Sequence, residues 1–137
     1  MPAILPLRAQ SDLITELVRE RLDTILPAAM DAAGIDMWII LCQEDDPDPL
    51  YRTMIPFDNW LPILSGLLFA RDDGRIRRYN LSTADTKDLY EVPYTGRLEE
   101  KQWETLADLV RTHDPARIGI NTMLRNLASG ESQSTAK

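Results

Sequence analysis

The first long pattern of hydrophobic positions in this chain is helical. Between residues 11 and 33, apolar side chains recur at steps of three and four, which predicts one buried stripe on an amphipathic helix. Ser11 is a candidate N-cap, and Gly34 stands where a left-handed C-cap is expected. Pro27 lacks an N–H and its ring clashes with the carbonyl four residues back, so we expect a kinked helix, with a break into two helices as the alternative. The expected stripe contains Leu13, Leu17, Val18, Leu22, Ile25, Ala29, Met30 and Ala33.

The next hydrophobic run, residues 37–42, is apolar at every position. A strand with one wet face would alternate, so we expect this strand to be covered on both sides, as in a sheet flanked by helices. Strands at residues 67–70 and 75–81 surround the turn Asp72-Asp73-Gly74 and predict a hairpin.

The second half of the chain predicts two helices and a last strand. Ser82 with Asp85 resembles a capping box and predicts a short helix that ends near Tyr90. A longer helix is expected at residues 99–112, and a strand follows at residues 117–121. The buried stripe of the longer helix is expected to contain Trp103, Leu106, Leu109 and Val110.

This order of elements predicts an α/β protein with one mixed sheet flanked by helices. Helical crossovers would place strands 37–42 and 117–121 in the interior of the sheet. We expect one domain over residues 1–128 and a disordered polar tail at residues 129–137.

Composition and charge exclude several classes of function. The net charge of −7 argues against a nucleic-acid partner, because phosphate binding requires clustered Lys and Arg. The one basic cluster, residues 75–79, is interpreted as an exposed strand face. No run approaches the roughly 20 apolar residues of a membrane span, and the proline-broken N-terminus does not resemble a signal peptide. A cytoplasmic location without membrane contact is expected.

Few side chains suggest catalysis. Cys42 ends an apolar run and is expected to be a buried, inert thiol. His113 is the only histidine, and its place at a helix end favours a dipole interaction over an acid/base role. One histidine and one cysteine, far apart in sequence, do not make a zinc site.

An acidic segment follows strand 37–42. Its carboxylates could gather a hard cation such as Mg²⁺ or Ca²⁺, but prolines occupy key places of the calcium-loop pattern. We favour a solvated acidic loop stiffened by proline, with metal or phospho-acceptor chemistry as the alternative. The acids are Glu44, Asp45, Asp46 and Asp48.

Three aromatic residues lie farther along the same loop: Tyr51, Phe57 and Trp60, with Asp58 and Asn59 between the last two. Such aromatics either fold back onto the core or present an adhesive surface. The sequence leaves both possibilities open.

Three stretches resemble the N-terminal part of the creatinase, prolidase and aminopeptidase P family. They are RLDTILPAAMDAAGIDMWII (21–40), LLFARDDGRIRRYNLS (67–82) and WETLADLVRTHDPARIGIN (103–121), and the resemblance extends over residues 17–121. It implies a ribonuclease H-like N-terminal domain. In the family this domain accompanies a C-terminal pita-bread catalytic domain, which holds two divalent metals through two Asp, one His and two Glu.

None of those metal ligands can be matched here, so the catalytic domain is expected to lie outside this chain. Neither a catalytic residue nor a bound metal or other cofactor is expected within it. The loop also departs from the family, because the span 51–57 lacks the glycine of the Tyr-Leu-Thr-Gly-Phe-like stretch that is often found there.

The resemblance implies a non-catalytic role. In family dimers this domain packs against the other subunit and walls its substrate entrance, so a homodimer or self-association is expected, partly through apolar residues in 50–64. Arg52 is the natural partner for a substrate carboxylate, which a guanidinium binds bidentately. A free-standing binding or regulatory module is the alternative, and an enzyme that uses the acidic loop with a metal is the third reading. The residues expected to line the surface are Tyr51, Arg52, Phe57, Asp58 and Trp60.

Overall fold

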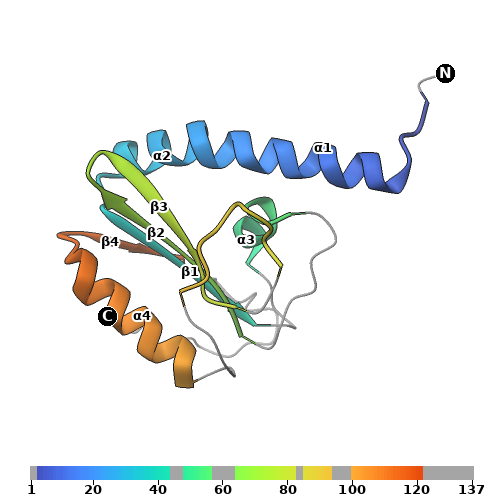
Figure 1. Cartoon of the computed structure of the whole chain (residues 1–137). Coiled ribbons are helices and arrows are strands. Elements are labelled where there is room, and N and C mark those ends of the chain that lie inside the picture. Colours follow the sequence, from blue (N-terminus) through green and yellow to red (C-terminus); the bar gives the residue numbers. More distant parts are fainter. Residues whose placement is uncertain (1–2, 44–47, 57–63, 83–84, 94–99, 122–137) are drawn as a thin grey trace, which may run out of the picture.

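The computed structural model describes residues 3–43, 48–56, 64–82, 85–93 and 100–121. Within these residues the chain forms a single α/β domain around a four-stranded mixed sheet of order β3-β2-β1-β4, in which β1 and β4 run parallel and the other pairs antiparallel. The N-terminal helices lie across one face of the sheet and α4 lies on the other (Figure 1). The elements are α1 (Leu7–Glu20), η1 (Arg21–Ile25), α2 (Leu26–Ala33), β1 (Met37–Gln43), α3 (Pro49–Thr53), β2 (Leu64–Asp72), β3 (Arg75–Asn80), α4 (Glu100–His113) and β4 (Ile118–Ile120).

Strand β1 is covered on both faces over most of its length, as its unbroken hydrophobic sequence predicts, but Leu41 is 38% exposed. Ile40 and Cys42 belong to the cluster beneath the N-terminal helices, whereas Met37 and Ile39 belong to the cluster on the α4 side. The first cluster is completed by Val18, Leu22, Leu26, Met30, Tyr51, Met54, Ile55, Leu67, Phe69, Leu89 and Tyr90. The second is completed by Leu68, Ala70, Tyr79 and Leu81, against which Leu106, Leu109 and Val110 pack.

The N-terminal helix begins earlier than predicted and does not break at Pro27. Pro6, and not Ser11, stands at the N-cap position. Before Pro27 the helix widens into the π-helical segment η1, where the N–H of Leu26 donates to the carbonyl of Arg21 five residues back. A regular turn would press the proline ring against the carbonyl of Asp23, and a wider turn relieves that clash while the chain stays helical.

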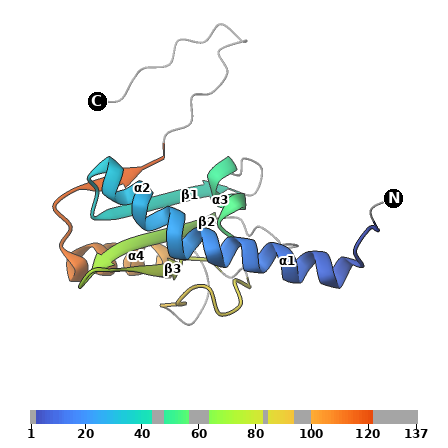
Figure 2. The same ribbon diagram turned by 90° about the horizontal axis from the view of Figure 1, so that it is seen from above.

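The buried stripe of this helix differs from the predicted one. Val18, Leu22, Leu26 and Met30 are buried at steps of four, because η1 adds a residue to one turn and rotates the following positions. The first half of α1 also extends past the end of the sheet, so its apolar residues have no sheet beneath them (Figures 1 and 2). Five predicted stripe residues are therefore exposed: Leu13 (50%), Leu17 (49%), Ile25 (60%), Ala29 and Ala33.

The predicted cap and hairpin turn are confirmed. Gly34 adopts φ +66° and ends α2 in the left-handed conformation. Asp73 and Gly74, with φ of 49° and 78°, form the two-residue turn between β2 and β3. Positive φ at both central positions is the type I′ geometry that matches the twist of a hairpin.

The predicted short helix at residues 82–90 is wrong for the residues described there. The Asn80 Oδ1 accepts hydrogen bonds from the backbone N–H (2.9 Å) and the hydroxyl (2.7 Å) of Ser82. The Asp85 carboxylate accepts the backbone N–H of Lys87 at 2.8 Å. Local side-chain acceptors thus satisfy the backbone in place of helical bonds, and the segment then makes a β-bridge to Tyr79 through Glu91.

The predicted helix at residues 99–112 is confirmed as α4 to within a residue at each end, but its predicted stripe is partly wrong. Trp103 is exposed, and the neighbouring Gln102 is buried and donates to the carbonyl of Leu81. Strand β4 lies at the edge of the described sheet and not in its interior, which leaves Ile118 and Ile120 43% and 67% exposed. The predicted end of the domain at residue 128 and the tail at 129–137 lie outside the described residues. Among the helices that the structure describes, none has the length and apolarity to cross a membrane.

Candidate functional site

The single-turn helix α3 is fixed by buried side chains and presents Arg52 on its outer side. Asp48 is 6% exposed, and its Oδ1 caps α3 by accepting the backbone N–H of Leu50 at 2.8 Å. Pro49 occupies the first turn, where its missing N–H costs no helical hydrogen bond. Tyr51 is fully buried in the core, whereas the next residue, Arg52, is exposed.

A part-buried hydrogen-bond relay ties α3 to the two parallel strands. The indole N–H of Trp38 in β1 donates to Oδ1 of Asn121 at 2.8 Å. The amide of Asn121, directly after β4, donates in turn to Oδ2 of Asp48 at 3.0 Å. Asp48 therefore has both carboxylate oxygens occupied. Asn121 and Asp48 each follow the carboxyl end of a parallel strand, which is the region where open α/β sheets place their ligand sites.

Two buried tyrosines hold the inner side of this region. The hydroxyl of Tyr90 donates to the carbonyl of Met54, just after α3, at 2.6 Å. Burial raises the pKa of Tyr90 and of Tyr51, and the hydroxyls of Ser82 and Ser65 offset part of the rise in the pKa of Tyr51. Both phenols therefore stay protonated near pH 7.

The structure separates the predicted surface residues. Tyr51 does not line a surface: its ring is part of the core, which is the fold-back alternative for the loop aromatics. Arg52 is exposed next to it, on a helix whose position is fixed. Phe57, Asp58 and Trp60 lie outside the described residues.

The residues considered for catalysis or metal binding are, where the structure describes them, buried or hydrogen-bonded within the fold. Cys42 is buried, as expected. Glu44, Asp45 and Asp46 lie outside the described residues, but Asp48 is not part of a solvated loop, because it is buried as a cap and a relay acceptor. His113 ends α4 as predicted, and its Nε2 lies 2.8 Å from the Tyr79 hydroxyl. No group of three or more His, Cys, Asp or Glu side chains suited to a metal occurs in the part of the chain that the structure describes.

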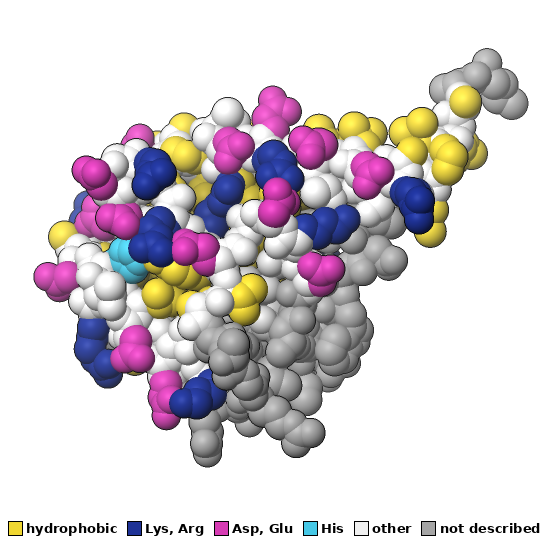
Figure 3. Space-filling model, in the orientation of Figure 1, with side chains coloured by type: hydrophobic (Ala, Val, Ile, Leu, Met, Phe, Trp, Pro, Cys, Tyr) yellow, Lys and Arg dark blue, Asp and Glu magenta, His cyan; other side chains and the backbone are white. Residues whose placement is uncertain are grey.

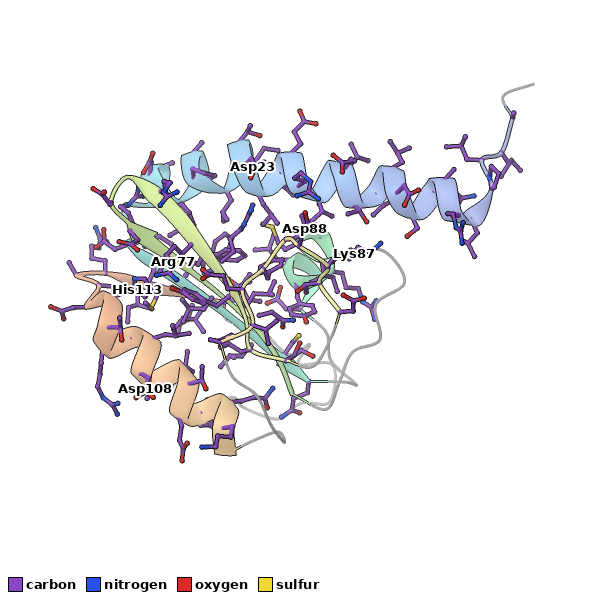
Figure 4. All side chains as sticks on the ribbon, viewed as in Figure 1. Asp23, Arg77, Lys87, Asp88, Asp108 and His113 are labelled. Carbon is purple, nitrogen blue, oxygen red and sulfur yellow. The ribbon has the colours of Figure 1, made fainter. Side chains whose placement is uncertain are left out.

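A shallow, strongly charged cleft of about 890 Å³ runs along β3, between the N-terminal helix and residues 88–91. Charges of both signs gather over this part of the surface (Figure 3), and Asp23, Arg77 and Asp88 on three of its sides are labelled in Figure 4. Its apolar lining comes from Leu22, Pro27, Ile76, Leu89 and Tyr90. The charged lining comprises Arg71, Arg75, Arg77, Arg78, Asp23, Asp31, Asp72, Asp88 and Glu91.

Ion pairs across the cleft connect elements that are distant in sequence. Arg78 pairs with Asp23 of η1 at 2.9 Å, and Arg71 pairs with Asp31 of α2 at 2.6 Å. Arg77 holds Glu91 through two hydrogen bonds of 2.8 and 3.1 Å.

These contacts set the charge state of the pair and correct a sequence-based interpretation. The hydrogen bonds from Arg77 lower the pKa of Glu91 and raise the pKa of Arg77. Arg77 and Arg78 of the basic cluster at 75–79 are thus held in cross-element ion pairs, so the cluster is not a uniformly solvated strand face. From the sequence, only the density of arginines on this strand could point to the ion pairs. The acidic partners lie in other elements and could not be predicted.

Comparison with known proteins identifies no relative: no protein-family model, curated protein or solved structure matches this chain.

Proposed function

We propose that this chain is a non-catalytic domain of the creatinase, prolidase and aminopeptidase P type, with a ribonuclease H-like arrangement. In this proposal it contributes dimer contacts and substrate access to a pita-bread catalytic domain, and the two divalent metals belong to that catalytic domain. The observation that carries the proposal is the fixed presentation of Arg52 by α3, in the loop that the resemblance assigns to the substrate entrance.

The order of elements supports this assignment. The stretch 21–40 forms a helix that ends at Gly34 and passes directly into β1, and the stretch 67–82 contains the β2–β3 hairpin. The stretch 103–121 contains most of α4 and the parallel strand β4. These are the three stretches on which the resemblance rests, and each one corresponds to the kind of element that the resemblance implies.

Arg52 has the chemistry that substrate access would require. Its side chain is exposed, and no ion pair or hydrogen bond occupies it among the described residues. Its neighbours Tyr51, buried in the core, and Asp48, held by the relay to Asn121, limit the movement of α3. A guanidinium on a helix that is held in place binds a carboxylate with less loss of conformational entropy than a guanidinium on a flexible loop.

The proposed dimer contacts have candidate surfaces. Leu13 and Leu17 are half exposed on α1, and Ile118 and Ile120 are exposed on the edge strand β4. Within the described residues β4 pairs with β1 alone, and apolar side chains at such a strand edge favour association with further protein. If the isolated chain stays a monomer in light scattering at high concentration, these surfaces do not drive self-association.

Kinetic analysis of Arg52 variants tests the proposal in the protein that carries both domains. Arg52→Ala is expected to lower kcat/KM about tenfold or more, because a charge-assisted hydrogen bond to the substrate is lost. Arg52→Lys should recover part of the loss. Arg111→Ala is the matched control, since Arg111 is an exposed arginine of α4 that, among the described residues, forms an ion pair with its helix neighbour Asp108. Unchanged kcat/KM in Arg52→Ala would contradict the proposed role.

A free-standing binding or regulatory module is the second candidate. It is favoured by the coverage of both sheet faces by helices of the chain itself, which gives the domain two buried clusters of its own. The coding sequence downstream separates the two functions. An in-frame pita-bread domain supports the first, and its absence supports the second.

A further inference from the structure

The outer edge of β3 carries backbone groups that are not used by the described fold. In the antiparallel pair with β2, the N–H of Leu81 donates to the carbonyl of Gly66, so alternate residues from position 81 backwards face β2. The residues between them face outwards. Asn80 and Arg78 accordingly bond to Glu91 on that side, through the Asn80 N–H (2.8 Å) and the Arg78 carbonyl (2.9 Å).

Ile76 has the same outward orientation but is not reached by the segment containing Glu91. Within the described residues, neither the N–H nor the carbonyl of Ile76, nor the N–H of Arg78, makes a backbone hydrogen bond on the outer side. These three groups lie at the charged cleft, which is lined by residues 74–78 of the hairpin. An unpaired strand edge beside a cleft is the geometry that proteins use to bind an extended peptide as an additional strand.

The charge at this edge that is left without an ion pair in the described part of the chain favours a peptide that carries carboxylates. Arg71, Arg77 and Arg78 are engaged in ion pairs with carboxylates of the chain itself. Arg75, at the start of β3, is exposed and makes no ion pair among the described residues. It is therefore the cation of the cleft that is available to a ligand carboxylate.

The same charges disfavour a second copy of this chain at the edge. If β3 paired with β3 of another molecule, the arginines at 75, 77 and 78 of both strands would be brought together. Like charges placed opposite each other in a sheet are destabilising, and charged edge strands are a known protection against such pairing.

The volume of the cleft, about 890 Å³, lies within the usual range for ligand pockets and is large enough for a short peptide segment.

We propose that the cleft beside β3 binds an extended, acidic peptide segment of another protein by strand addition. The main chain of the peptide pairs with the Ile76 N–H and carbonyl and the Arg78 N–H, and a peptide carboxylate binds Arg75. This surface lies at the opposite edge of the sheet from β4, and it is independent of the role proposed for Arg52.

Fluorescence anisotropy with a labelled, end-blocked peptide of alternating Glu and Val tests this proposal on the whole chain. The acidic peptide is expected to bind, and Arg75→Glu is expected to weaken binding about tenfold or more, as loss of a charge-assisted bond predicts. Arg8→Glu is the matched control, because Arg8 is an exposed arginine of α1 that does not line the cleft, and its affinity should stay within about twofold of the wild type.

Two further peptides separate strand addition from simple charge attraction. The same peptide with alternate backbone nitrogens methylated keeps its charge but cannot pair as a strand, and it should lose binding. A Lys and Val peptide should not bind. The proposal is overturned if the acidic peptide fails to bind at about 1 mM, a limit that corresponds to about −4 kcal/mol. It is also overturned if Arg75→Glu binds as the wild type does, or if the methylated peptide binds equally well.

Discussion

Replacing Asp48 with alanine removes the side chain that connects α3 to both parallel strands. The substitution deletes the N-cap acceptor of Leu50, and such a loss costs about 1 kcal/mol. It also leaves the part-buried amide of Asn121 without its acceptor, a penalty of about 1–3 kcal/mol. The expected loss of unfolding free energy is therefore about 2–4 kcal/mol, a large part of the roughly 5–15 kcal/mol typical of a domain.

Urea unfolding followed by tryptophan fluorescence and circular dichroism measures this loss. Asp48→Asn keeps an oxygen at the cap position but turns its amide N–H groups toward the amide of Asn121, so it should keep the cap and still lose about 1–3 kcal/mol through the relay. Asp12→Ala, on the exposed face of α1, is the control and should stay within about 0.5 kcal/mol of the wild type. If Asp48→Ala also stayed within that range, α3 would not be held by this relay, and the fixed presentation of Arg52 would lose its physical basis.

Three further predictions test the core, the helix cap and the acid response. Leu22→Ala should cost about 2–5 kcal/mol, whereas Leu17→Ala should cost less than about 1 kcal/mol, and equal losses in a denaturant titration would contradict the observed stripe. Gly34→Ala should lower stability by about 1 kcal/mol or more in the same assay, because φ is +66°, and a more stable variant would contradict this. Arg77 holds the pKa of Glu91 below its ordinary 4.5, so the stability from this pair is complete above pH 4.5 and is lost as the pH falls through the lower folded pKa. Glu91→Gln should therefore flatten this part of an acid-unfolding curve, and an unchanged curve would show that the pair does not contribute.

The elements with strong local signals could be predicted from the sequence. Asp73-Gly74 and Gly34 determine backbone conformations that few other residues adopt, so the hairpin turn and the end of α2 follow from them directly. The unbroken apolar run of β1 requires cover on both faces, and the structure provides it. These signals depend on a few neighbouring residues and not on the tertiary fold.

The predictions that were wrong concern positions whose structure depends on tertiary contacts. Leu17 has the spacing of a buried residue, but the widened turn at η1 and the end of the sheet determine which face of α1 is covered. Ser82 has the spacing of a capping box, but its backbone N–H and its hydroxyl both donate to the side-chain oxygen of Asn80, and no helix begins among the residues described there. Trp103 was predicted to be buried but is exposed, because Gln102 is the residue of this turn that is buried and bonds to the carbonyl of Leu81.

The candidate site was predicted only in part, for the same reason. Arg52 could be proposed from residue type and position, whereas the burial of Tyr51 could not. Asp48 looks like one more acid in an acidic loop, and its role depends on Asn121, 73 positions later in the chain. Partners at such sequence distances leave no periodicity that a sequence pattern could reveal.

The central claim is that this chain shapes the active site of another domain and carries no reactive centre of its own. The most direct measurement is hydrolysis of an Xaa-Pro dipeptide by the purified chain, with Mn²⁺, Zn²⁺ or Mg²⁺ supplied in turn. We predict release of proline indistinguishable from that in buffer with the same metal. Hydrolysis that rises in proportion to the concentration of the chain would contradict the claim.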